Sequence, residues 1–195
     1  MSRVPADLYI SVDVESDGPI PGPYSMLSFG LAVAGRFDGQ SFEKREPHVL
    51  TFYRELRPIS ADFVAEAIAV TGLDRDELSR SAARPEEALP EAKRWVEEVT
   101  GNDRPVLVGY PLVFDWMFLT WYLEQFADGS PFGYSAGLDM KSLYATKAGV
   151  PISAAGKDDL PPTLRPITQH THHALEDAIE QAMIFGTLFD WRPDQ

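Results

Sequence analysis

Short runs rich in apolar residues, separated by polar segments, recur through residues 7–56 and are typical of strands. Residues 7–14 (DLYISVDV) predict a buried strand, and residues 26–35 and 48–56 predict two more, joined by a polar loop. Residues 104–110 (RPVLVGY) predict a further short buried strand. The fold is therefore expected to open with a meander of three strands and to add a fourth strand later.

Helical spacing dominates the remaining segments. The predicted helices cover residues 61–72, 85–101, 113–126, 138–149 and about 172–190. The helix at 113–126 is apolar nearly all round, so it should lie in the interior. In the last helix, Ala174, Ala178 and Ala182 form a four-residue row, and side chains this small let a helix lie close against a sheet. Strands first, then helices alternating with strands, predict an α/β domain with a mixed sheet.

Length and composition bound the class of protein. The 195 residues are the size of one domain, which we expect to span 1–195. No apolar run approaches the roughly 20 residues of a membrane span. The N-terminus enters a strand pattern without the layout of a signal peptide, so we expect a cytoplasmic protein with no membrane contact. The absence of cysteine excludes disulfides and thiolate metal sites.

The net charge of −13 argues against a protein that grips a long duplex, because such binding needs many Lys and Arg contacts to phosphates. It does not exclude a nucleic-acid enzyme. A pocket that holds divalent cations and one strand end has its own positive charge.

Two carboxylates stand at the end of the first predicted strand. Side chains alternate across a strand, so Asp13 and Glu15 share one face and project together. Two carboxylates this close repel each other unless one is protonated or a cation lies between them. Hard divalent ions such as Mg²⁺ take ligands of this kind. The alternative is a solvated pair at a strand exit, beside Ser16 and Asp17.

A third carboxylate, Asp115, lies in the apolar helix at 113–126 and shares a face with Phe118, Leu119 and Tyr122. A lone buried charge costs several kcal/mol unless a partner compensates it. The alternative is that Asp115, in the first turn, faces the helix dipole. Both interpretations stay open from these residues alone.

The segment QHTHHALEDAIEQA, residues 169–182, contains histidines and acidic residues at the start of the last helix. Thr171 is a candidate cap, which leaves Glu176 and Asp177 in the early turns. A histidine cluster suggests zinc, but the ligand spacing of a structural zinc site is missing. Helix-end electrostatics is the plain alternative. The segment before it, residues 150–169, is an irregular, proline-rich loop of a length that is often functional.

Taken together, three motifs resemble those of the DEDDh 3′–5′ exonucleases, the group of ribonuclease T, oligoribonuclease and the proofreading subunit of bacterial replicative polymerases. They are D-V-E at 13–15, F-D at 114–115 and H-H-A-L-E-D at 172–177. The order and the D-x-E spacing match. The family places a histidine five residues before the last aspartate, and here that position is His172. Residues 57–78 also resemble the segment after the third strand in these proteins, so the resemblance covers nearly the whole chain.

The resemblance implies a ribonuclease H-like mixed five-stranded sheet flanked by helices, and a metal-dependent 3′–5′ exonuclease. Such an enzyme releases nucleoside 5′-monophosphates from single-stranded or short RNA or DNA. Asp13, Glu15, Asp115 and Asp177 would hold two divalent cations, Mg²⁺ or Mn²⁺, ~3.5–4 Å apart. His172 would take the proton from the attacking water as general base.

The resemblance also implies a pocket for the terminal nucleotide. Its expected residues are Ser16, Asp17, Thr71, Gly72 and Leu73. Phe114 and Phe118 are either stacking surfaces for bases or plain core residues. The chain departs from the family where Tyr110 and Pro111 replace a common His-Asn pair, and where Asp17 replaces a commoner threonine. These departures concern substrate contacts more than the metal site.

Two other functions are compatible with these residues. One is a hydrolase of free nucleotides or small phosphodiesters at the same site. The other is a non-catalytic binding module that kept the fold to recognise a protein, although the presence of all five expected site residues disfavours it. No motif distinguishes RNA from DNA. A homodimer is expected from the resemblance alone.

Overall fold

The computed structural model describes residues 5–166 and 172–193. Its strands are β1 (Asp7–Ser16), β2 (Met26–Phe37), β3 (Phe42–Lys44), β4 (Thr51–Glu55), β5 (Arg104–Gly109) and β6 (Gly137–Asp139). Its α-helices are α1 (Ala65–Thr71), α2 (Arg75–Ser81), α3 (Pro85–Thr100), α4 (Leu112–Phe126), α5 (Met140–Ala148) and α6 (Ala174–Leu188). Two short 3-10 turns, η1 (Ile152–Ala154) and η2 (Lys157–Asp159), lie in the irregular segment after α5. None of the helices in these ranges has the length and apolar character needed to cross a membrane.

The six strands form one mixed sheet with five positions, in the order β3-β2-β1-β5-β6. Strand β4 also pairs with β2, so it shares a position with β3. β1 is antiparallel to β2 and parallel to β5, and β5 is parallel to β6. The predicted fold class, a mixed sheet flanked by helices, is confirmed. β3 and β6 were not predicted, because three residues are too few to show a period.

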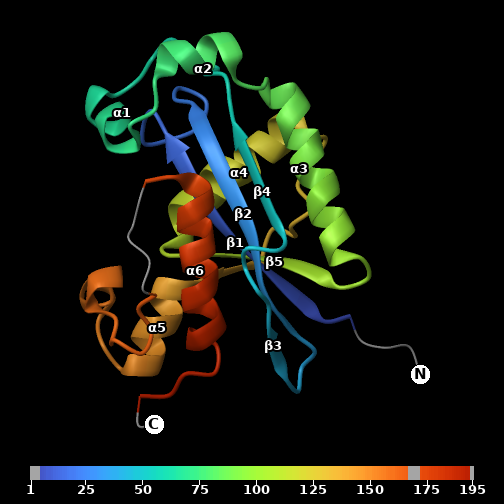
Figure 1. Cartoon of the computed structure of the whole chain (residues 1–195), viewed down its shortest axis with the longest axis vertical. Coiled ribbons are helices and arrows are strands. Elements are labelled where there is room, and N and C mark those ends of the chain that lie inside the picture. Colours follow the sequence, from blue (N-terminus) through green and yellow to red (C-terminus); the bar gives the residue numbers. More distant parts are fainter. Residues whose placement is uncertain (1–4, 167–171, 194–195) are drawn as a thin grey trace.

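Helices cover both faces of the sheet (Figure 1). On one face, Ile10, Val12 and Val14 pack in a core with residues of α3 and α4. On the other face, Tyr9 packs in a second core with residues of α5 and α6. The alternation along β1 therefore separates its side chains as predicted, and residues at odd positions face α6.

Helix α6 lies very close to the sheet at its N-terminal end. A Cβ atom on Gly30 would lie 2.4 Å from the carbonyl oxygen of Ala174, so only glycine permits this approach. Ala174, Ala178 and Ala182 are buried, as the four-residue row predicted. Gly30 pairs with Asp13 across the β1–β2 ladder. The first turns of α6 are therefore held directly beside the acidic end of β1.

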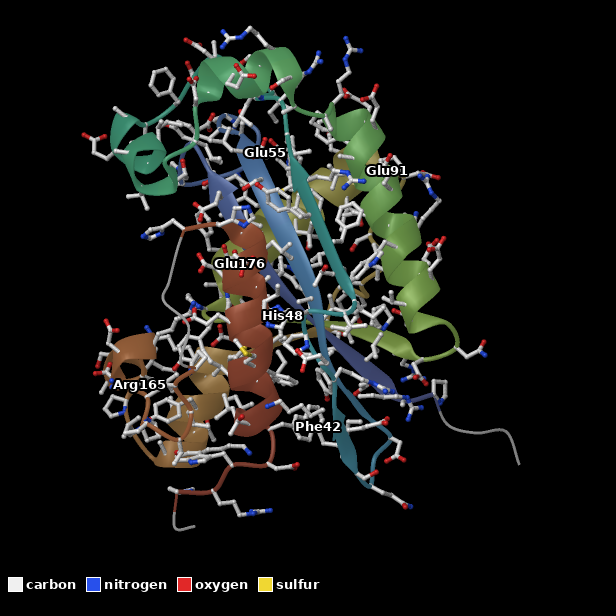
Figure 2. All side chains as sticks on the ribbon, in the orientation of Figure 1. Phe42, His48, Glu55, Glu91, Arg165 and Glu176 are labelled. Atoms are coloured by element: carbon white, nitrogen blue, oxygen red, sulfur yellow. The ribbon has the colours of Figure 1, made fainter. Side chains whose placement is uncertain are left out.

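The other end of α6 is anchored by aromatic side chains. Phe42 of β3 stacks on Phe189, just after α6, with ring centroids 4.1 Å apart, and it also contacts Phe185. Figure 2 shows Phe42 next to the C-terminal end of α6. Because both ends of the helix are tied to the sheet, the position of its early residues relative to β1 is well determined.

The region predicted as one helix at 61–72 holds α1, and a second helix, α2, follows it after Gly72. Gly72 has φ +65°, a left-handed conformation that ends α1. Asp74 then caps α2, because its side chain accepts the backbone N–H groups of Asp76 and Glu77. The predicted helix at 138–149 is α5, preceded by the short strand β6.

Candidate active site

Asp13 and Glu15 project from the carboxyl end of β1 on the face that α6 covers. Glu15 is 9% exposed and Asp13 is partly exposed. Carboxyl ends of parallel strands are where open α/β sheets place their ligands, and β1 and β5 are parallel here. The two carboxylates therefore stand where the sheet topology predicts a site.

Asp115 lies in the first turn of α4 and is buried. Its Oδ1 atom accepts the backbone N–H of Val14, the residue between Asp13 and Glu15, at 3.0 Å. Its charge also raises the pKa of Asp13. Asp115 therefore reaches across to β1 and joins the acidic group, which favours the site interpretation over a role at its own helix end alone.

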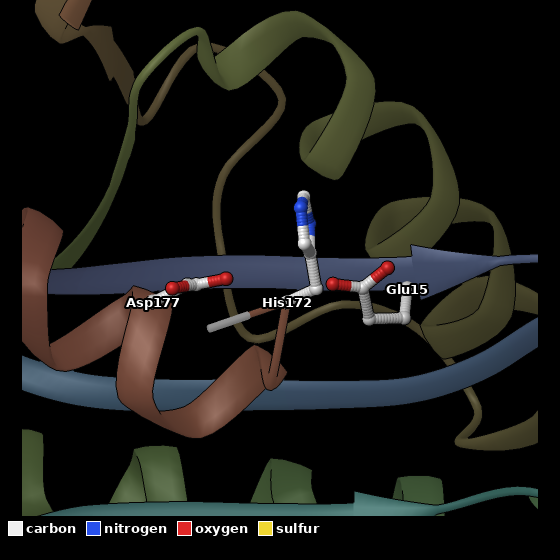
Figure 3. A group of neighbouring side chains, drawn as sticks. All are labelled: Glu15, His172 and Asp177. Atoms are coloured by element: carbon white, nitrogen blue, oxygen red, sulfur yellow. The ribbon is translucent and has the colours of Figure 1, made fainter. Parts of the chain in front are cut away.

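Asp177 lies in the first turn of α6 and is 2% exposed. Glu15, His172 and Asp177 each offer one possible metal-ligand atom, and these three atoms lie within 4.8 Å of one another. In the view of Figure 3 the His172 ring stands between the carboxylates of Glu15 and Asp177. Strand β1, helix α4 and the start of helix α6 thus bring all five predicted residues to one place.

Burial and mutual repulsion raise the pKa values of three of these carboxyls. Burial, and then the charge of Asp177, raises the pKa of Glu15 to about 7. Burial raises the pKa of Asp115 to about 8, although the hydrogen bond from the N–H of Val14 acts to lower it. The pKa of Asp13 lies well above its usual range because of burial and the nearby Asp115, Asp177 and Glu15. In each case the ionised form is disfavoured.

A divalent cation fits this arrangement. Hard cations such as Mg²⁺ and Mn²⁺ take carboxylate oxygens as ligands, and a bound cation makes the ionised form of each carboxyl favourable again. Lys157, the basic residue whose charge lowers the pKa values of Asp13 and Asp115, is itself paired with Glu180 at 3.1 Å. The predicted ligands were the carboxylates of Asp13, Glu15, Asp115 and Asp177, whereas His172, predicted as a base, also lies within the group.

The histidines separate into two environments. His172 is exposed, has φ +53°, and lies beside Glu15 and Asp177. A positive φ is uncommon for a residue other than glycine and often marks a functional position. His173 instead stacks on Tyr53, with ring centroids 4.6 Å apart. His172, the site histidine in the predicted register, is thus the one beside the carboxylates, and its role stays a prediction. His170 and the predicted cap Thr171 lie outside the described residues.

A hollow of about 480 Å³ opens beside Glu15. It is mainly apolar, and α1 with the residue before it forms one wall. It is lined by Val14, Glu15, Ser16, Gly18, Pro19, Val64, Ala67, Val70, Thr71 and Phe114. Ser16 and Thr71 were predicted substrate residues and line it. Gly72 and Leu73 do not line it; they form the turn after α1, where Thr71 Oγ1 accepts the N–H of Leu73 at 3.2 Å.

Two predicted substrate residues occupy other environments. Phe118 is 0% exposed and packs within the core, so it cannot contact a nucleotide without unpacking the domain. Phe114, one turn earlier, is the ring that lines the hollow. Asp17 is also 0% exposed. Its carboxylate accepts from Arg75 Nε at 2.9 Å and from the N–H of Ser25, so it is committed to internal contacts.

Sequence reasoning missed two residues, Gln181 and Arg75. Gln181 is buried on α6 and donates a hydrogen bond from Nε2 to Asp13 Oδ1 at 2.8 Å. A signal existed for it, because Gln181 lies four residues after Asp177 and therefore shares its face. Arg75 gave no signal, because its partner lies 58 residues away in the sequence.

Comparison with known proteins agrees with this geometry. No family model matches the chain. The chain is 36% identical over 187 residues to the 3′–5′ DNA exonuclease Cap18 of Escherichia coli. The aligned region covers 95% of this chain and 94% of Cap18. The similarity therefore extends over nearly the whole length of both proteins.

Solved structures share the fold at low identity. The nuclease domain of 3′hExo, a DEDDh family member bound to rAMP, has a TM-score of 0.68 and 17% identity, with 94% of this chain and 92% of that domain covered. A 3′-exonuclease that recognises the histone mRNA stem-loop gives a TM-score of 0.68 and 15% identity over 95% and 83% of the two chains. The complex of E. coli ExoI with single-stranded DNA gives a TM-score of 0.60 and 15% identity.

The chain spans 42% of the length of that ExoI chain, so it corresponds to part of the larger enzyme. These structural matches show the fold, and Cap18 shows the family. The resemblance inferred from the three motifs is confirmed. By its match to Cap18 over nearly its whole length, the chain belongs to the family of 3′–5′ exonucleases, and its fold is that of the DEDDh enzymes among them.

Proposed function

We propose that the protein removes nucleotides one at a time from the 3′ end of single-stranded DNA and releases nucleoside 5′-monophosphates. Asp13, Glu15, Asp115 and Asp177 hold two divalent cations, Mg²⁺ or Mn²⁺, and His172 is the general base. The observation that carries this proposal is the meeting of four carboxylates and His172 at the carboxyl end of β1, beside an apolar hollow.

Each side chain has a role that follows from its surroundings. Bound at these carboxylates, two divalent cations would supply activation of the attacking water and stabilisation of the leaving oxygen of the phosphodiester. His172 accepts the proton of that water; its exposed side chain next to Glu15 and Asp177 is within reach of solvent. Asp115, held by the N–H of Val14, keeps α4 and β1 in fixed relation, which maintains the spacing of the carboxylates.

The hollow beside Glu15 suits the terminal base. Its wall from α1 presents Val64, Ala67 and Val70, and Phe114 presents an aromatic ring. Stacking of a base on an aromatic side chain contributes about 1–3 kcal/mol. Contacts of the apolar wall with a base do not distinguish one base from another, so we propose that the enzyme trims 3′ ends of many sequences. Ser16 and Thr71 contribute the polar edge of the hollow.

DNA is proposed as the substrate because Cap18, the relative that is similar over the full length, is named a DNA exonuclease. Among the structural neighbours, the ExoI complex contains single-stranded DNA, whereas the 3′hExo domain holds rAMP. The two sugars differ in the 2′-hydroxyl, which a protein contacts when it selects RNA. RNA is therefore the competing outcome.

The test uses two 5′-labelled single-stranded oligomers of the same sequence, one DNA and one RNA, incubated with Mg²⁺, Mn²⁺ or EDTA. We expect a DNA ladder that shortens from the 3′ end, disappears in EDTA, and disappears in the Asp177→Ala variant. A ladder on RNA alone would overturn the choice of DNA. Cleavage of neither oligomer, with hydrolysis of a free nucleotide, would instead indicate a small-phosphodiester hydrolase.

Two expectations from the sequence, the homodimer and the cytoplasmic location, stay predictions. Sedimentation of the purified protein measures the first, and fractionation of cells that express it measures the second.

A further inference from the structure

Gln181 connects the three parts of the chain that form the site. It lies on α6 one turn after Asp177 and is 1% exposed. Its Nε2 group donates to Asp13 Oδ1 on β1 at 2.8 Å. Its Oε1 atom accepts the backbone N–H of Tyr110, directly after β5. One side chain therefore contacts the end of β1 and the end of β5 from the helix that carries Asp177.

A side-chain amide meets both requirements at this position. The N–H of Tyr110 needs an acceptor, and the carboxylate of Asp13 needs a donor. A glutamine offers one of each at the end of a flexible chain. The orientation of the amide follows from the same argument, because the opposite orientation would place two donors against each other at Tyr110 and two acceptors against each other at Asp13.

The contact at Tyr110 falls where this chain departs from the family pattern. Tyr110 stands in the place of the common histidine, and its hydroxyl donates to the carbonyl of Ala155 at 2.9 Å, so its side chain is directed into the fold. Its backbone N–H is then the group that faces α6, and Gln181 accepts it. The end of β5 is thereby tied to the helix that carries Asp177.

We infer that Gln181 is a positioning residue for the metal site: it orients the carboxylate of Asp13 before a cation binds. This inference rests on the proposed assignment of Asp13 as a metal ligand. The hydrogen bond from Gln181 Nε2 to Asp13 Oδ1, at 2.8 Å, fixes one oxygen of the carboxyl group and so limits its rotation about χ2. Hydrogen bonds to ligating carboxylates are a known requirement for tight metal binding.

The test is a titration of the full-length protein with Mn²⁺, followed by calorimetry or by the electron paramagnetic resonance signal of free Mn²⁺. Gln181→Met keeps the volume and removes both hydrogen bonds. We expect Gln181→Met to weaken Mn²⁺ binding by about 10–100-fold, the usual cost of losing a group that supports a ligand. The Mg²⁺ concentration for half-maximal hydrolysis should rise by a similar factor. The matched control is Met183→Leu on the same helix, which should change neither quantity.

A purely structural role predicts a different result. In that case Gln181→Met would lower the melting temperature in EDTA and leave Mn²⁺ affinity as in the wild type, which would overturn the inference. If Gln181→Met does not give folded protein, Gln181→Asn supplies the same test. Asparagine is one methylene shorter and cannot reach both partners, so it should weaken Mn²⁺ binding as well.

Failure of the proposed metal site is distinguishable from failure of this inference. The wild type and Asp13→Ala are titrated in parallel. A wild type that binds no Mn²⁺ overturns the site and the role of Gln181 with it. The role of Gln181 alone would be overturned by a different result. In that case the wild type binds Mn²⁺, Asp13→Ala does not, and Gln181→Met binds Mn²⁺ as tightly as the wild type.

Discussion

Asp17 follows β1 directly, two residues after Glu15 and four after Asp13, but its environment is the opposite of theirs. Asp17 is 0% exposed, and its carboxylate is paired with Arg75 at 2.9 Å and bonded to the N–H of Ser25. Asp13 and Glu15 face other carboxylates, and their pKa values are raised. Burial of a carboxylate is therefore no evidence of a site by itself; what matters is the charge that it faces.

The basic residue beside Asp17 and the histidine beside Glu15 also differ in their environments. Arg75 sits on α2, has a side chain only 18% exposed, and also donates to the carbonyl of Ser60. Its pairing with Asp17 ties α2 to the segment that follows β1. His172 is exposed beside Glu15 and Asp177. Arg75 is placed to maintain structure, whereas the role proposed for His172 is to exchange a proton with water.

The comparison predicts opposite effects of the same substitution at Asp13 and at Asp17. Asp13→Asn removes one like charge from the acidic group, so we expect hydrolysis to fall to background while the melting temperature in EDTA at pH 8 rises. Asp17→Asn leaves Arg75 without its charged partner, so we expect the melting temperature to fall. Thermal unfolding and the oligomer assay measure both. An Asp13→Asn variant that is active, or less stable than the wild type, would contradict the assignment.

A substitution of His172 tests the difference between His172 and Arg75. His172→Ala should lower the hydrolysis rate by about 10²–10⁴-fold, the usual scale for a general base, and should leave Mn²⁺ binding and melting temperature largely unchanged. His173→Ala is the matched control, because its ring packs on Tyr53 instead. Loss of activity in His173→Ala together with a fully active His172→Ala would show that the register of the third motif is wrong.

Arg75→Ala should affect stability far more than a surface ion pair does. It leaves the buried Asp17 carboxylate without a cation, and breaking a buried pair from one side costs about 3–5 kcal/mol. The control is Arg80→Ala, which removes an exposed pair with Glu77 on the same helix and should cost about 0–1 kcal/mol. Urea denaturation gives both free energies of unfolding. Equal costs for the two variants would mean that the Asp17–Arg75 pair has no special structural role.

The pH dependence of stability tests the acidic group without any substitution. The pKa of Glu15 is raised from its ordinary value of 4.5 to about 7, and that of Asp115 from 3.8 to about 8. The folded state therefore holds these protons more tightly than the unfolded chain does. In EDTA, stability should fall as pH rises from about 4 to about 8, by about 3 kcal/mol for Glu15 alone.

Cation binding should cancel this loss, because a cation replaces the protons as the partner of the carboxylates. The measurement is the free energy of unfolding in urea between pH 5 and 8.5, with EDTA and with Mn²⁺. A flat profile in EDTA would mean that the carboxylates are not the repelling group described above. Asp13→Asn should flatten the profile partly, whereas Arg80→Ala should leave its slope unchanged.

Helices and strands long enough to show several repeats of their hydrophobic period were predictable from the sequence, and the three-residue strands were not. The helix at 113–126 and the strand at 7–14 agree with α4 and β1 to within two residues. β3 and β6 have three residues each, so their pairing depends on β2 and β5 and not on any pattern of their own. The division between α1 and α2 depends on Gly72 and on the Asp74 cap, a signal that the sequence contains.

The sequence by itself determined which residue types meet and on which faces they project. Strand alternation placed Asp13 and Glu15 together, and the resemblance to the DEDDh exonucleases indicated His172 among the histidines before Asp177. Only the tertiary structure decided what each of them faces. It assigned Asp17 to Arg75, Asp13 to Gln181, and Phe118 to the core. The physical reason is that periodicity is a local property of the backbone, whereas a partner that lies 58 or 168 residues away is determined by how the whole domain packs.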